Sequence, residues 1–141
     1  MNAEDLLGVW KLISWVQEYD DGRSQHLFGE RPEGLLIYSV GGYMSGTMQA
    51  GGRKNLSKGQ WTSPPEEAAA AYVTFLGYAG RFTIDGNDVI HHIEVSSFPN
   101  WAGVDQRRHA SLDDGVLRLV TGRIEAGTSE SRTATLTWRR A

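Results

Sequence analysis

Residues 81–121, RFTIDGNDVIHHIEVSSFPNWAGVDQRRHASLDDGVLRLVT, decide the fold of this chain. Alternating or β-rich runs, typical of strands, lie at 81–85, 89–98, 105–112 and 116–121. Between them, DGND at 85–88 and DDG at 113–115 are strong turn signals. Tight turns between consecutive strands predict an antiparallel meander.

The rest of the chain extends the same pattern. Four further strand-like runs lie at 9–19, 35–39, 43–48 and 131–139. We therefore predict an all-β fold: one domain over residues 1–141, built as an eight-stranded antiparallel up-and-down barrel with one short α-helix. A barrel of this size holds either its own side chains or one small ligand.

One helix interrupts the strands. Ser63 is a candidate N-cap, Pro64 stands at the first helical position, and Glu66 has the capping-box spacing. We expect the helix to run through Leu76 and to end at Gly77. The long segment 49–63 before it is expected to be a lid or mouth element.

Composition excludes several classes of function. The chain of 141 residues has a net charge of −3 and no long run of like charge, which gives no reason to bind nucleic acid or an anionic membrane. Without cysteine there is neither a disulfide nor a thiolate site. The N-terminus lacks a signal-peptide pattern and no segment could span a membrane, so we expect a cytoplasmic protein.

Residues 90–108 carry more ionisable groups than a core-filling strand needs, because unpaired charges are expensive to bury. Along 105–112 the even-numbered residues are the less polar set, which predicts that they face inward. A register that pairs Glu94 with Arg108 would put His92 opposite Ala110, all inside the barrel. A slip of one residue would reverse this arrangement.

That register suggests a chemistry. Arg108 would keep Glu94 ionised, and His92 would exchange a proton near neutral pH, so these three are the candidate catalytic residues. Alternatively, Glu94 and Arg108 form a structural ion pair, or Arg108 holds a ligand carboxylate or carbonyl. The candidate ligand-binding residues are Met44, Arg81, Ser96, Asn100, Trp101 and Gln106.

Metal binding is not expected. His91 and His92 are adjacent on a strand and point to opposite faces, and the sequence has no HExxH or comparable ligand cluster. A single axial histidine for haem stays open as an alternative. The main interpretation needs no cofactor.

Several motifs are similar to those of lipocalins. Gly8-Val9-Trp10 opens the first strand and Leu136-Thr137-Trp138-Arg139 closes the last. With His91-His92-Ile93-Glu94, Pro99-Asn100-Trp101 and Gln106-Arg107-Arg108, the chain resembles the bacterial and fungal lipocalin-like domain family over nearly its whole length. The resemblance implies a small barrel whose Gly-x-Trp plugs the closed end beneath a late arginine. It also implies genes that often neighbour secondary-metabolism enzymes.

Three functions remain open at this stage. The first is binding of a small, partly apolar metabolite, with or without cofactor-independent isomerase, cyclase or lyase chemistry. The second is a non-catalytic carrier or sensor of a hydrophobic ligand. The third is a homodimeric interaction protein whose barrel is filled by its own side chains.

Overall fold

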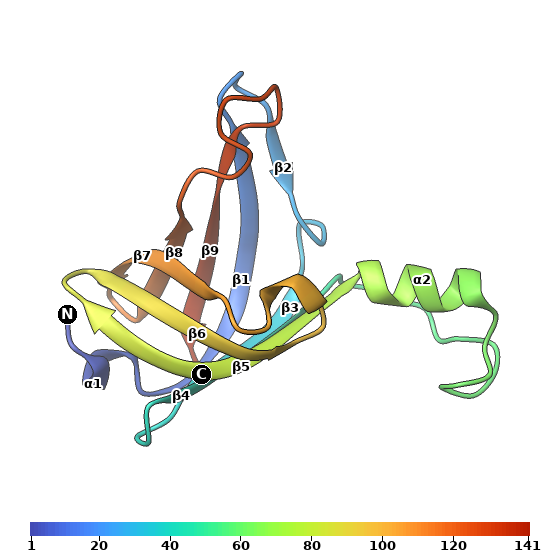
Figure 1. The fold of residues 1–141 in the computed structure, drawn as a ribbon, viewed down its shortest axis with the longest axis horizontal. Coiled ribbons are helices and arrows are strands. Elements are labelled where there is room, and N and C mark those ends of the chain that lie inside the picture. The colour runs from blue at the N-terminus through green and yellow to red at the C-terminus, as the bar shows by residue number, and fades with distance from the viewer.

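The computed structural model describes residues 1–141. Two α-helices, one 3₁₀-helix and nine strands follow one another along the chain (Figure 1). Their bounds are α1 (Ala3–Leu6), β1 (Gly8–Tyr19), β2 (Ser24–His26), β3 (Glu33–Tyr38), β4 (Tyr43–Gln49), α2 (Pro65–Val73), β5 (Phe75–Asp85), β6 (Asp88–Ser96), η1 (Pro99–Trp101), β7 (Asp105–Asp113), β8 (Val116–Thr121) and β9 (Arg132–Arg140).

The sheet closes into an eight-stranded barrel, as predicted. Strand order is β1-β3-β4-β5-β6-β7-β8-β9, every pair is antiparallel, and β9 pairs with β1 to close the ring. The eight predicted strand runs all correspond to strands of this barrel. The short β2, which the sequence did not indicate, adds to the far end of β1 outside the ring.

A tryptophan plugs the end of the barrel where the chain begins. Trp10 is fully buried, and its indole N–H donates to the carbonyl of Leu6 at the end of α1 (2.8 Å). The guanidinium of Arg140 stacks 4.1 Å from the centre of the Trp10 ring and donates to the carbonyls of Asp5 and Leu7. The packing arginine implied by the resemblance is thus Arg140, one residue beyond the quoted Arg139.

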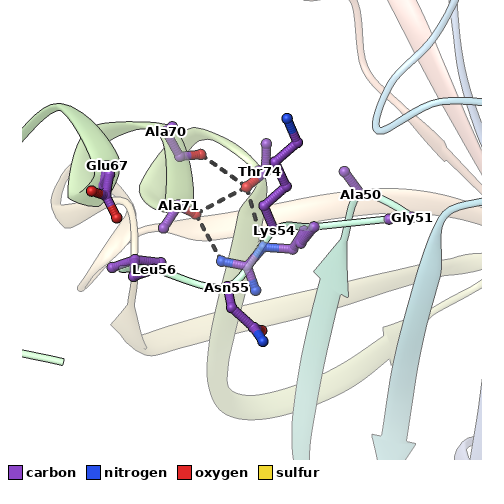
Figure 2. Close-up of a pocket in the computed structure, with 11 residues that line it drawn as sticks. Ala50, Gly51, Lys54, Asn55, Leu56, Glu67, Ala70, Ala71 and Thr74 are labelled. Carbon is purple, nitrogen blue, oxygen red and sulfur yellow. Dashed lines mark hydrogen bonds between the residues drawn. The ribbon is translucent and has the colours of Figure 1, made fainter. Parts of the chain in front are cut away.

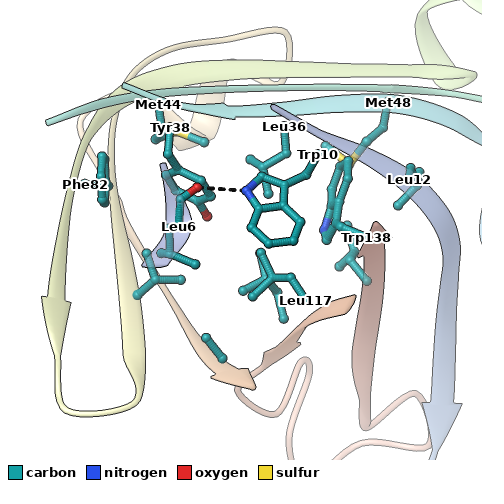
Figure 3. Close-up of a cluster of buried hydrophobic side chains, with 14 of the residues drawn as sticks. Leu6, Trp10, Leu12, Leu36, Tyr38, Met44, Met48, Phe82, Leu117 and Trp138 are labelled. Atoms are coloured by element: carbon teal, nitrogen blue, oxygen red, sulfur yellow. Dashed lines mark hydrogen bonds between the residues drawn. The ribbon is translucent and has the colours of Figure 1, made fainter. Parts of the chain in front are cut away.

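The core fills this closed end. Alternate residues of the strands point inward, and Figure 3 shows Leu36, Leu117 and Trp138 packed around Trp10. At the opposite end lie the β4–β5 connection, the loop with η1 and the β8–β9 connection, as the up-and-down topology requires.

The predicted helix is shorter than expected. α2 ends at Val73, and residues from Phe75 onward belong to β5, which pairs along β4. Ser63 is not the N-cap: Pro64 holds that position, and the Ser63 hydroxyl bonds within the preceding loop. Figure 1 shows α2 and its loop projecting away from the barrel, so the helix covers no face of the sheet. The strong pairing of β5 with β4 overrides local helix signals.

The predicted β6–β7 register is wrong. Arg108 pairs with Val89, not with Glu94, and Gln106 pairs with His91. The hairpin turns earlier than assumed, because Ile93 already bonds to Gly103 and Val104 across the turn. On β6 the odd-numbered residues up to Ile93 therefore face inward, and not the even-numbered ones as predicted. On β7 the even-numbered residues do face inward, as predicted.

A β-bulge explains the irregular upper part of β6. Tyr78 pairs with Ser96 and Gly80 with Ile93, which leaves one extra residue, Glu94, on β6. Gly80 permits this close approach, since a Cβ there would overlap the carbonyl oxygen of His92. The bulge turns Ser96 to the face of Tyr78 and leaves Glu94 exposed.

Neither α1 nor α2 is long and apolar enough to cross a lipid bilayer.

Candidate functional site

A histidine lies between two tyrosines inside the barrel. His91 is fully buried, with Tyr38 Oη 2.8 Å from its Nε2 and Tyr78 Oη 3.4 Å from its Nδ1. The three side chains come from β6, β3 and β5, whose pairing brings their inner faces together. They form a continuous polar chain across the barrel interior.

The direction of the protons in this chain follows from burial. Tyr38 is more deeply buried than Tyr78 and its hydroxyl lies closer to His91, so we assign the Tyr38 O–H as the donor to Nε2. His91 then carries its proton on Nδ1 and donates toward Tyr78 Oη. This leaves the hydroxyl proton of Tyr78 without an acceptor in the protein.

Arg108 brings a positive charge to the same interior. Its Nη1 donates to Gln106 Oε1 (3.2 Å) and to the carbonyl of Arg107 (3.0 Å), and no carboxylate lies within ion-pair distance. The other two inward arginines differ: Arg132 pairs with Glu125, and Arg140 binds backbone carbonyls. Arg108 is thus the inward cation that lacks an anion.

Burial changes the ionisation of these groups. The pKa of His91 is lowered to about 3, mainly because the side chain is buried and in smaller part because of the charges of Arg108 and His92. Burial also raises the pKa of Tyr38 well above its usual value and raises that of Tyr78. At neutral pH the His91 and tyrosine side chains are therefore uncharged, and the charge of Arg108 is uncompensated.

The low pKa of His91 makes stability depend on pH. Unfolded His91 takes up a proton near pH 6.5, but folded His91 does so only near pH 3. The stability that comes from keeping His91 neutral is fully present above pH 6.5 and is lost as pH falls from 6.5 toward 3. Between pH 7 and pH 5 we expect this residue to lower the free energy of unfolding by about 2 kcal/mol.

Urea denaturation at the two pH values measures this effect. In His91→Phe the fall in the free energy of unfolding between pH 7 and pH 5 should be smaller than in the wild type by about 2 kcal/mol. This difference does not depend on how stable the variant is at pH 7. The matched variant Ile90→Phe, on the outer face of the same strand, introduces the same side chain without removing a titratable group and should keep the wild-type pH dependence. An unchanged loss in His91→Phe would contradict the assignment.

Further hydrogen-bond donors in the core lack acceptors. The indole N–H groups of Trp15 and Trp138 are buried and bond to no protein atom. Most buried donors in proteins find a partner. With Tyr78 and Arg108, they make the interior rich in donors and poor in acceptors.

His92 and Glu94 do not join this site. His92 lies on the outer face, with Nε2 2.8 Å from Thr83 Oγ1 and Nδ1 2.8 Å from Asp105 Oδ1. Glu94 is exposed at the bulge. The predicted inward set of His92, Glu94 and Arg108 is therefore wrong in its geometry, and only Arg108 lies inside.

The predicted ligand-binding residues divide into two groups. Gln106 faces inward and bonds to Arg108, and Trp101 packs edge-to-face on Tyr78, with ring centres 5.5 Å apart. Met44 is buried in the core, and Ser96 shares the face of Tyr78. These four lie on the interior or at its rim.

The other two lie outside. Arg81 is exposed, and its guanidinium stacks on the outer ring of Tyr43 at 5.2 Å. Asn100 is exposed in η1. Neither approaches the buried polar chain.

Sequence reasoning missed Tyr38, Tyr78 and His91. The alternation Val89, His91, Ile93 does indicate that His91 is buried, but the assumed pairing with β7 overruled this signal. Tyr38 follows three consecutive apolar residues, Leu35–Ile37, so alternation does not indicate which face it occupies. Tyr78 lies between the predicted helix and the predicted strand at 81–85, so it was assigned to no element.

A surface hollow lies outside the barrel. Figure 2 shows it between α2 and the loop 50–56, with Thr74 and the alanines of α2 on one side. Its main cation, Arg53, already donates to Thr74, Gln49 and the Ala71 carbonyl. Arg53 thus has protein acceptors for its donors, in contrast to Arg108 in the interior.

Comparison with known proteins identifies the family of this chain. The family model described as a lipocalin-like domain matches residues 7–141. The 4'-hydroxy-3'-methoxypropiophenone carrier protein ppsC of Aspergillus oryzae is 34% identical over 103 residues, 67% of this chain and 88% of that protein. A lipocalin-like protein of Bacteroides uniformis shares the fold, with a TM-score of 0.51 and 14% identity over 97% of this chain and 99% of that one. The chain belongs to the lipocalin-like domain family.

Proposed function

We propose that this protein is a carrier that binds a small aromatic molecule bearing acceptor oxygens. One observation carries the proposal: the inward guanidinium of Arg108 has no carboxylate partner. A partly buried cation without an anion is costly unless something else accepts its hydrogen bonds. The ligand would supply that acceptor, and the free hydroxyl proton of Tyr78 would be a second donor to it.

The similar fungal protein supports this class of ligand. Its name describes a carrier of 4'-hydroxy-3'-methoxypropiophenone. That compound is a planar aromatic ring with ketone, methoxy and hydroxyl oxygens, all of which accept hydrogen bonds. Aromatic side chains such as Trp101 and Tyr78 suit a planar ring.

Transport is a better proposal than catalysis for this interior. Acid–base chemistry needs a group that titrates near the working pH. None of the inward strand residues is Asp or Glu, and His91, with a pKa of about 3, is a poor base. The interior can hold an oxygen atom but has little with which to abstract a proton.

Binding of 4'-hydroxy-3'-methoxypropiophenone, measured by isothermal titration calorimetry, tests the proposal. We expect one site per chain. Arg108→Met should weaken binding roughly 10- to 150-fold, because hydrogen bonds to a charged group contribute about 1.5–3 kcal/mol.

The neighbouring residue supplies a matched control. Arg107 points outward and pairs with Asp85 and Asp88, so Arg107→Met should leave the affinity unchanged. Equal losses in both variants, or no binding by the wild type, would argue against the proposed site.

A homodimer is a second candidate role, favoured by an apolar strip on the outer face. Val9 pairs with Ile37 and Lys11 with Leu35, and the three apolar side chains are each about 40% exposed. Contiguous exposed apolar surface often marks a protein interface. Sedimentation velocity tests this: a dimer that Ile37→Lys converts to a monomer would support it, and a monomer at all concentrations would exclude it.

A further inference from the structure

The free edge of the Arg108 guanidinium determines which form of a ligand the barrel prefers. A guanidinium has five N–H donors. The two on Nη1 are used by Gln106 and the Arg107 carbonyl, so the three on Nη2 and Nε have no protein acceptor. Arg108 as a whole is only partly buried.

Nothing around this cation neutralises it. The titratable side chains near it are Tyr38 on β3, Tyr78 on β5 and His91 on β6, and all three are uncharged at neutral pH. Its partner across the β7–β8 ladder is the uncharged Thr121. The interior therefore offers an anion one full positive charge and several unused donors.

We propose that the barrel binds its aromatic ligand as an oxyanion, so that a phenol enters as phenolate with its oxygen on Arg108 and Tyr78. This rests on the proposed carrier function and specifies the ionisation state of the cargo. A charged acceptor forms stronger bonds with a guanidinium than a neutral hydroxyl does. It also removes the cost of the unpaired cation, which a neutral phenol leaves in place.

The proton balance of this step is simple. The O–H bond of the phenol breaks, the electron pair stays on oxygen, and the proton leaves to the solvent. No inward group takes it up, since His91 already holds one proton and resists a second. At a pH below the pKa of the free phenol, each binding event should therefore release close to one proton.

An acyl group para to the hydroxyl makes such a phenol more acidic than tyrosine, whose pKa is about 10. Ionisation moves its absorption band to longer wavelength, so bound phenolate can be seen directly. The experiment uses 4'-hydroxy-3'-methoxypropiophenone at one pH unit below its free pKa, with protein in excess. Its 4'-methyl ether, 3',4'-dimethoxypropiophenone, cannot ionise and serves as the matched ligand.

We expect the phenolate band in the wild type and in Arg107→Met, and its loss in Arg108→Met. Arg108→Lys, which keeps the charge, should restore part of the band. The methyl ether should bind roughly tenfold more weakly than the phenol, which at this pH corresponds to a fall of about two units in the pKa of the bound phenol. Calorimetry in two buffers of different ionisation enthalpy should report release of close to one proton.

Two results would overturn the inference in distinguishable ways. If the phenol binds with a neutral spectrum and the ether binds equally well, the oxyanion inference fails and the carrier function stands. If neither compound binds, both fail. Urea denaturation of each variant establishes that a lost band reflects the missing charge and not an unfolded barrel.

Discussion

Trp10→Ala is expected to lower the free energy of unfolding by about 3–5 kcal/mol, the usual cost of truncating a buried tryptophan. Trp10 is fully buried and fills the closed end of the barrel. The change also removes the hydrogen bond to Leu6 and the surface on which Arg140 stacks. Both contacts hold α1 against the strands, so their loss opens the floor of the barrel.

Urea denaturation followed by circular dichroism measures this effect. Trp61 provides the matched control, because it is 88% exposed in the loop before α2. Trp61→Ala should change stability by no more than about 0.5 kcal/mol. Similar losses in the two variants would show that the plug contributes little to the fold.

Gly80→Ala is also expected to have a large effect, lowering the free energy of unfolding by about 3 kcal/mol or more. The added methyl group would overlap the carbonyl of His92 and lie 2.9 Å from the amide nitrogen of Glu94. Both are backbone atoms of a paired strand, so they cannot move aside as a flexible side chain does. Relief would require the bulge and its hydrogen bonds to open.

Gly122→Ala is the control for this substitution. A Cβ at Gly122 meets no atom within 4 Å, and its backbone conformation is accessible to alanine. We expect the free energy of unfolding to change by no more than about 1 kcal/mol. Alanine restricts the unfolded chain more than glycine does, which slightly favours the folded state. If denaturation gives equal stabilities for the two variants, the bulge tolerates a side chain and the packing argument fails.

The barrel could be predicted because its signals are local. Turn sequences such as DGND at 85–88 and DDG at 113–115 specify where strands end, and consecutive strands joined by tight turns leave little choice of topology. β2 was missed because Ser24–His26 is short, exposed and without an apolar face. It depends on pairing with β1, which composition does not reveal.

The interior of the site could not be predicted in the same way. Alternation assigns residues to two faces, but deciding which face is inside requires the register, and this depends on where a loop turns. The turn between β6 and β7 begins at Ile93, before the Pro99–Trp101 segment that marks it in the sequence. One wrong assumption there exchanged His91 for His92.

The helix boundary failed for a different reason. Phe75 and Leu76 continue a plausible helical pattern after α2, and glycine at 77 is a common stop signal. The neighbouring β4 offers these residues a complete set of backbone partners. Such long-range pairing outweighs a weak local preference.

The bulge at Glu94 also has a consequence for reading other members of the family. It divides β6 into two blocks whose inward positions are set independently: His91 and Ile93 below it, Ser96 above it. An alignment that treats β6 as one uninterrupted strand will assign the residues of one block to the wrong face. In evolution, a single insertion or deletion at position 94 can exchange the side chains presented at the mouth and leave the Tyr38–His91–Tyr78 chain in place.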